Sequence, residues 1–383
     1  MADSTRESDR ILREAKTSLA VQREGGTHRP APRGQSIGKG SAELKLKSLL
    51  TKVRNIALAI FAIWLGAGIA GAFVNGIGFW GVMAVIVATA VAVAVFSSFP
   101  KVKVPKRAEL TLGNPAQMVA REVMVPSHDG TLVPASIIHH RDLKLDGNSP
   151  TILYGYGAYG ESLDPWFSHA RLSLLERGVA FAIAHVRGGG ELGEAWYRAG
   201  KQEHKHNTFS DFIACAEFLI LNGITTAEKL AISGGSAGGL LIGAVLNQRP
   251  DLFGVAIAEV PFVDVLNTML DPDLPLTVTE YDEWGNPEEP DVYERIKAYA
   301  PYENVTAQDY PATLVIAGYN DSRVQYWEAA KWVAKLRATK TDDNVLLLKT
   351  ELGAGHGGMS GRYQGLRDVA LEYAFVFKAL GLI

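Results

Sequence analysis

The stretch 229–241 constrains this chain most, because an apolar run passes directly into a small-residue helix pattern through a Gly-x-Ser-x-Gly sequence. Glycines around a serine at such a junction are typical of a strained strand-to-helix turn, where larger side chains would collide. The turn would lift the Ser236 hydroxyl above a sheet and place the Ala237 N–H at a helix start, facing a developing oxyanion. The pattern predicts a catalytic serine, and an ordinary glycine-rich turn is the alternative.

Strand-like and helix-like segments alternate after residue 118. Apolar runs bounded by turn residues predict strands, and an Asp-Gly turn predicts that the first two form a hairpin. Alternation of this kind is typical of a mostly parallel sheet covered on both faces, so we expect an α/β-hydrolase fold with about eight strands. The expected strands are 120–126, 131–140, 150–154, 179–186, 229–233, 254–260, 312–318 and 344–349, and the expected helices are 164–177, 208–221, 238–248, 325–338 and 363–380.

Two further residues complete a candidate catalytic triad in the chain order that this fold requires. Asp321 follows the expected strand 312–318, and His356 lies in a glycine-rich loop after the strand 344–349. His356 would take the proton of Ser236 and return it to the leaving group, while Asp321 would hold the imidazole tautomer. A turn aspartate and a histidine in a tight turn are the structural alternatives.

The composition excludes several other kinds of site. The net charge of −3 is too small to indicate a polyanionic partner, so no nucleic acid is expected. The single cysteine, Cys215, excludes an internal disulfide and a cysteine-based zinc cluster. Because neither a metal-binding nor a nucleotide-binding motif occurs, we predict no metal and no cofactor.

Two uncharged runs, Ile56 to Val74 and Ile77 to Phe99, precede the candidate catalytic part. Each has about twenty residues, the length that a helix needs to cross a bilayer. They predict a two-helix transmembrane hairpin within residues 53–99. Basic residues flank the hairpin on both outer sides, so we expect an integral protein of the inner or plasma membrane with its catalytic domain in the cytoplasm.

The chain is thereby divided into four parts. Residues 1–52 are polar and basic, which predicts a disordered tail. The hairpin at 53–99 would contact membrane lipid, and its glycines could pack two copies into a homodimer. A proline-containing linker at 100–118 leads to the expected α/β-hydrolase domain at 119–383.

Several sequence blocks around the candidate triad carry a family resemblance. They are Leu153–Gly160, Val186–Trp196, the serine turn, Asn320–Val324 and Gly355–Gly358, together with Arg249–Phe253, Val260–Leu266, Glu283–Pro287 and Arg323–Glu328. In this order the blocks resemble the catalytic domain of the prolyl oligopeptidase family of serine peptidases, from about residue 119 to the C-terminus. The last four blocks are most similar to the oligopeptidase B branch of that family.

The resemblance implies roles for residues beside the triad. Tyr156 matches the tyrosine whose hydroxyl would join the Ala237 N–H in the oxyanion hole. Arg323 matches an arginine that binds a main-chain carbonyl of the substrate. A packed aromatic and a salt bridge are the respective structural alternatives for Tyr156 and Arg323.

The resemblance also implies a preference for basic substrates. Relatives that cleave after proline carry a tryptophan where this sequence has Thr277. Glu280 and Asp282 instead match carboxylates with which oligopeptidase B neutralises Arg or Lys at P1, and an acidic surface loop is their structural alternative. Asp164 matches one of two acids that bind the P2 residue, whereas the second acid is replaced here by Trp166.

Together these observations predict a serine peptidase that cleaves peptide substrates after Arg or Lys through an acyl-enzyme on Ser236. A carboxylesterase stays open, because the same triad hydrolyses esters. The β-propeller of the family has no counterpart here, since no repeat of short strands occurs and the hairpin and linker stand in its place. A membrane-tethered catalytic domain and an inactive fusion of a truncated peptidase domain are therefore both open.

Overall fold

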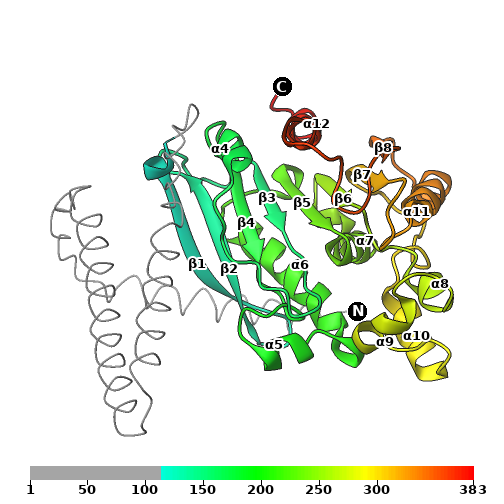
Figure 1. Ribbon diagram of the computed structural model, residues 1–383. Coiled ribbons are helices and arrows are strands. Elements are labelled where there is room, and N and C mark those ends of the chain that lie inside the picture. The colour runs from blue at the N-terminus through cyan, green and yellow to red at the C-terminus, as the bar shows by residue number, and fades with distance from the viewer. Residues whose placement is uncertain (1–113) are drawn as a thin grey trace, which may run out of the picture. The chain divides into compact units, whose positions relative to one another are not determined.

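An eight-stranded sheet organises residues 114–383, which are the residues that the computed structural model describes (Figure 1). The strand order is β1-β2-β4-β3-β5-β6-β7-β8; β2 pairs antiparallel with β1 and β4, and all other neighbours are parallel. The mostly parallel α/β sheet predicted from the sequence is thus confirmed. The strands are β1 (Met118–Pro126), β2 (Leu132–His140), β3 (Thr151–Tyr154), β4 (Ala180–Ala184), β5 (Leu230–Gly235), β6 (Val255–Glu259), β7 (Ala312–Gly318) and β8 (Leu346–Glu351).

Helices cover both faces of this sheet (Figure 1). Those expected from the sequence are α4 (His169–Leu175), α6 (His206–Leu221), α7 (Ala237–Gln248), α11 (Tyr326–Thr339) and α12 (Arg362–Ala379). The structure adds α5 (Glu194–Arg198), α8 (Val265–Met269), α9 (Thr277–Trp284) and α10 (Pro290–Tyr299), none of them longer than 10 residues. Helices this short are marginal alone, so their packing against the rest of the fold stabilises them.

Each central strand contributes side chains to two separate hydrophobic cores. In β4, Phe181 and Ile183 pack on the side of α4 and α12, whereas Ala182 and Ala184 pack on the side of α6 and α7. Successive residues of a strand point to opposite faces, so a sheet covered on both sides needs apolar residues at every position. This requirement explains why the central strands are recognisable in the sequence as continuous apolar runs.

A buried ion pair attaches the loop after β4 to α6 and to the leading hairpin. Asp211 of α6 is fully buried and accepts hydrogen bonds from Arg187 Nε at 2.8 Å, Arg187 Nη2 at 2.6 Å and the Ser127 hydroxyl at 2.6 Å. Arg187 Nη1 also donates to Asp129 at 2.6 Å, in the turn between β1 and β2. One guanidinium therefore holds together three segments that are distant in sequence.

Replacing Asp211 by alanine should lower the free energy of unfolding by about 3–5 kcal/mol, because the buried Arg187 guanidinium loses its fully buried partner and keeps only the partly exposed Asp129. Urea unfolding of the purified chain measures this loss. Asp251→Ala is the matched control, since Asp251 pairs with Arg249 at the surface and should change stability by less than about 1 kcal/mol. Equal losses in the two variants would contradict the assigned importance of the buried pair.

The predicted integral-membrane localisation is corrected by the helices of the structure. Within residues 114–383, no helix combines the length and the apolar character that crossing a membrane requires. The 18-residue helix α12, for example, carries the charged residues Arg367, Asp368, Glu372 and Lys378. The predicted tail at 1–52 and hairpin at 53–99 lie outside the described residues. The described residues give no support to the membrane localisation, the lipid contact or the hairpin homodimer.

Candidate active site

The parallel strands bring three predicted site residues to one edge of the sheet. Ser236 follows β5, Asp321 follows β7 and His356 follows β8, and these strands are neighbours in the order β5-β6-β7-β8. Because parallel strands run in one direction, the loops after their carboxyl ends gather at the same edge, where open α/β sheets bind their ligands. Residues separated by more than a hundred positions in the chain therefore share one region.

Ser236 lies in a strained turn between β5 and α7. Its backbone angles are φ 56° and ψ −119°, in a region that residues other than glycine rarely adopt. Its N–H donates to the Glu259 carbonyl at 2.9 Å, and its carbonyl accepts from the Phe262 N–H at 3.1 Å. A Cβ atom at Gly234 would lie 2.5 Å from the Gly238 carbonyl oxygen, so the turn requires glycine at that position.

Asp321 and His356 are in direct contact through their side chains. Asp321 Oδ2 lies 2.7 Å from His356 Nδ1, and Asp321 Oδ1 accepts from the N–H groups of Arg323 at 2.8 Å and Val324 at 3.0 Å. Burial acts to raise the pKa of Asp321, but these hydrogen bonds outweigh it and hold the pKa below its ordinary value. The ionised carboxylate can only accept, so Nδ1 donates in this hydrogen bond, which leaves Nε2 as the ring nitrogen that can act as a base.

Asp321 and His356 are joined by this hydrogen bond, whereas none joins His356 to Ser236 among the residues that the structure describes. A longer separation between the base and the nucleophile is common before a substrate binds. The structure therefore places the aspartate–histidine pair and the strained serine at one edge of the sheet.

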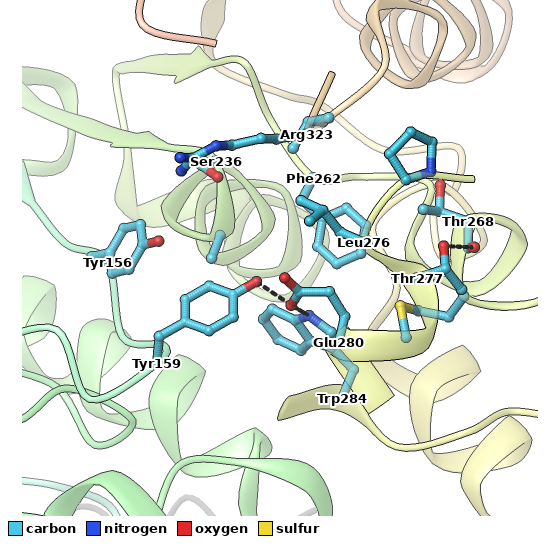
Figure 2. A pocket seen from close by; sticks show the side chains of 14 residues that line it. Tyr156, Tyr159, Ser236, Phe262, Thr268, Leu276, Thr277, Glu280, Trp284 and Arg323 are labelled. Atoms are coloured by element: carbon cyan, nitrogen blue, oxygen red, sulfur yellow. Dashed lines mark hydrogen bonds between the residues drawn. The ribbon is translucent and has the colours of Figure 1, made fainter. Parts of the chain in front are cut away.

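Tyr156 and Ala237 lie beside Ser236 as possible donors to an oxyanion. Tyr156 follows β3, and Figure 2 shows its hydroxyl turned toward the same pocket as Ser236. Burial and the nearby charge of Glu161 raise the pKa of Tyr156 to about 12, so the hydroxyl keeps its proton at neutral pH. Ala237 is the first residue of α7, where the N–H groups of a helix have no partner within the helix.

A pocket of about 240 Å³ opens beside Ser236 and contains one carboxylate, Glu280 (Figure 2). Glu280 Oε2 accepts from the Tyr159 hydroxyl at 2.7 Å and from Trp284 Nε1 at 3.1 Å. Phe262 and Trp284 contribute aromatic surface to the wall. The pocket thus combines apolar walls with a single acidic group that two donors hold in place.

The structure separates the two acids predicted to bind P1, because both lie on helix α9. Residues two positions apart on a helix do not share a face, whereas residues three apart do. Glu280 faces the pocket, but Asp282 has 85% of its side chain exposed and pairs with Lys201 at 2.9 Å. Glu283, three positions after Glu280, is buried instead and accepts from the Tyr197 hydroxyl at 2.6 Å.

Arg323 lines the pocket, and its side chain is exposed. Asp164 is exposed in the loop before α4 and does not line this pocket. The neighbouring Trp166 is held on the α4 side, where the Arg171 guanidinium lies 4.5 Å from the centre of its ring. The structure therefore brings Arg323 to the site and leaves Asp164 outside it.

Sequence reasoning missed Tyr159, Trp284 and Phe262 as pocket residues. Each lies within a block that carries the family resemblance, but a block of similar residues does not say which side chains face a pocket. Tyr159 has a backbone φ of 59°, a left-handed conformation that is uncommon for tyrosine. Its hydroxyl reaches Glu280 from a loop that precedes α9 by more than a hundred residues.

A serine at a strand-to-helix turn beside an aspartate–histidine pair, on a mostly parallel sheet, is the arrangement of α/β-hydrolases. A family model described as the prolyl oligopeptidase family matches residues 165–382. The chain belongs to that family, which confirms the resemblance drawn from the sequence blocks.

Relatives support this assignment over the same part of the chain. Protease 2 of Moraxella lacunata is 49% identical over 70% of this chain and 39% of its own length, and dipeptidyl aminopeptidase BI of Pseudoxanthomonas mexicana is 48% identical over 70% and 37%. Both matches therefore span about two fifths of the relative.

Solved structures of oligopeptidase B are similar as well. The enzyme from Leishmania major matches with a TM-score of 0.69 and 51% identity over 70% of this chain and 37% of that chain. The closed form from Trypanosoma brucei, with covalently bound antipain, matches with a TM-score of 0.69 and 52% identity over 70% and 38%. The predicted likeness to oligopeptidase B is confirmed, but these similarities give no support to a membrane hairpin in place of the propeller.

Asp321→Asn should slow the reaction of Ser236 with a fluorophosphonate by about 10³–10⁴-fold, because an amide donor opposite Nδ1 favours the wrong histidine tautomer. The rate of covalent labelling, read by intact mass, measures the change. Asp309→Asn is a control, since Asp309 precedes β7 at the opposite edge of the sheet. Unchanged labelling of Asp321→Asn would contradict the assigned hydrogen bond.

The same variant gives a pH test of stability. Because the folded-state pKa of Asp321 is lowered, its carboxylate stabilises the fold above the unfolded pKa, and this stability is lost as the pH falls through the folded pKa. The stability advantage of the wild type over Asp321→Asn should therefore shrink as the pH falls below about 4. Urea unfolding at a series of pH values measures it, and a constant difference would contradict the lowered pKa.

Proposed function

We propose that residues 119–383 form a serine peptidase domain that hydrolyses peptide bonds after Arg or Lys through an acyl-enzyme on Ser236. The observation that carries the proposal is the 2.7 Å contact between Asp321 and His356 at the sheet edge where Ser236 also lies. Membership of the prolyl oligopeptidase family supports the same reaction class.

Each step of the proposed reaction has a residue to perform it. His356 Nε2 takes the hydroxyl proton of Ser236 while the Ser236 oxygen bonds to the acyl carbon of the substrate. The Ala237 N–H and the Tyr156 hydroxyl donate to the oxyanion that forms. His356 then gives its proton to the leaving amine, and a water activated by the same histidine hydrolyses the acyl-enzyme.

Charge and shape in the pocket support a basic P1 residue. Glu280 Oε2 already accepts two hydrogen bonds, whereas Oε1 accepts none from the described residues and is available to a cation. The aromatic walls would contact the aliphatic part of a lysine or arginine, whose charged end the carboxylate would bind. Arg323, at the same pocket, would bind a main-chain carbonyl, and we do not include Asp282 or Asp164 in the proposal.

Glu280→Gln should lower kcat/KM for Arg- and Lys-amide reporters by about 100-fold, since a desolvated charge pair is worth roughly 2–5 kcal/mol. Steady-state hydrolysis of Arg-, Lys-, Pro- and Phe-amides by the purified chain measures it. Asp282→Asn is the matched control on the same helix and should change kcat/KM by less than about threefold, because its carboxylate pairs at the surface.

Other outcomes would identify a different function. A preference for Pro-amides, or indifference to Glu280→Gln, would remove the claim about P1. Hydrolysis of short acyl esters without hydrolysis of any amide would favour a carboxylesterase. Failure of fluorophosphonate to label Ser236 would contradict the enzyme altogether.

A further inference from the structure

Two buried charged side chains form hydrogen bonds with the backbone of the loop that follows β3 and carries Tyr156. Lys205 Nζ donates to the Gly157 carbonyl at 2.6 Å, and Glu283 Oε1 accepts from the Tyr159 N–H at 3.2 Å. The cation thus holds a carbonyl and the anion holds an N–H, two positions apart in one short loop. Neither Lys205 nor Glu283 lines the pocket.

The Lys205 ammonium lies in an unusual environment for a positive charge. Its side chain is 2% exposed at the start of α6, and its ammonium lies 4.9 Å from the centre of the Trp284 ring. Its ammonium has no carboxylate partner at ion-pair distance within residues 114–383. Burial lowers its pKa to about 8, although Glu283 acts in the opposite direction, so the charged form still predominates at neutral pH. Burying a charge without a direct partner is unfavourable. The stability of the fold therefore does not explain why a lysine occupies this buried position, where its ammonium contacts the Gly157 carbonyl and the Trp284 ring.

Glu283 is the matching negative charge. It is 3% exposed on α9, and its second oxygen, Oε2, accepts from the Tyr197 hydroxyl at 2.6 Å. Hydrogen bonds to both oxygens fix the orientation of the carboxylate, so the oxygen that receives the Tyr159 N–H cannot turn away without losing a second bond.

The backbone of this loop is strained, so contacts from other segments are needed to hold its conformation. Gly157 and Tyr159 both have left-handed backbone angles, φ 74° and φ 59°, and the second costs energy because tyrosine has a Cβ atom. A Cβ atom at Gly157 would lie 2.4 Å from Thr208 Cγ2, so the loop also packs tightly against α6. A loop in this conformation relaxes when its contacts are removed, and the position of Tyr156, which immediately precedes Gly157, would relax with it.

We infer that Lys205 and Glu283 are positioning residues that fix the Tyr156 hydroxyl in the oxyanion hole by clamping the loop backbone that directly follows Tyr156. The inference rests on the proposed function for its effect on rate, but the clamp itself is a statement about the loop. The two parts can therefore be tested separately.

The first test measures the loop without any assay of activity. Amide hydrogen exchange of the segment 155–161 should be about tenfold faster in Lys205→Met and in Glu283→Gln than in the wild type, because the N–H groups of Tyr159 and Gly160 become less protected. Exchange in β5 should not change. Lys340→Met is the matched control, because Lys340 is another largely buried lysine but lies before β8, at the opposite edge of the sheet. Unchanged exchange of 155–161 in both variants would overturn the clamp.

The second test measures coupling to Tyr156. Lys205→Met should lower kcat for an Arg-amide by about 10–100-fold with little change in KM, as expected when a donor to the transition state is displaced. In a Tyr156→Phe background, the same change should cost less than about threefold, because the hydroxyl that it positions is already absent. Equal losses in the two backgrounds would assign Lys205 a general structural role and overturn the inference.

Glu283→Gln keeps the size of the side chain and serves as the second variant if Lys205→Met does not fold. If fluorophosphonate fails to label Ser236 in the wild type, the proposed function fails, while the exchange experiment still decides whether the clamp exists. Faster exchange with an unchanged kcat would retain the clamp as a contact and overturn its role in positioning Tyr156.

Discussion

Parallel pairing of β5, β6, β7 and β8 is the constraint on which the site depends. Because these strands run in one direction, their carboxyl ends form one edge, and a short loop from each end is enough to bring Ser236, Asp321 and His356 into one region. The loops can stay short because the strand ends already lie close to the positions that the three side chains occupy. The strained backbone of Ser236 is held by hydrogen bonds to Glu259 at the end of β6 and to Phe262 just after it, so even this strained residue is supported by the neighbouring strand.

The electrostatics of the site follow from how each group is buried. Asp321 is enclosed but surrounded by donors, which keeps it ionised, whereas Tyr156 is enclosed near negative charge, which keeps it protonated. One group therefore accepts and the other donates at the same pH. The buried side chains of Lys205 and Glu283 do not line the pocket; they contact the backbone of the loop that carries Tyr156.

The sheet and the larger helices were predictable, and the region between β6 and β7 was not. Short apolar runs bounded by turn residues, such as 312–318, are typical of strands in a sheet that is covered on both faces, so these strands could be predicted. Helices α8, α9 and α10 are short and are separated by segments that contain proline, glycine and aspartate, and only packing of residues such as Trp284 and Ile296 makes them stable. Without α9, the sequence could not say that Glu280 and Asp282 face in different directions.

By itself the sequence determined the order of the triad residues along the chain and the glycine requirement of the serine turn, because both follow from residue types and their positions in the chain. It also determined the family, through blocks of residues in a fixed order. Only the tertiary structure decided which acids face the pocket and which buried charges hold the Tyr156 loop. Those contacts join segments far apart in the chain, such as Lys205 with Gly157 and Tyr159 with Glu280, and the spacing of residues along a chain does not encode which side chains meet across a folded core.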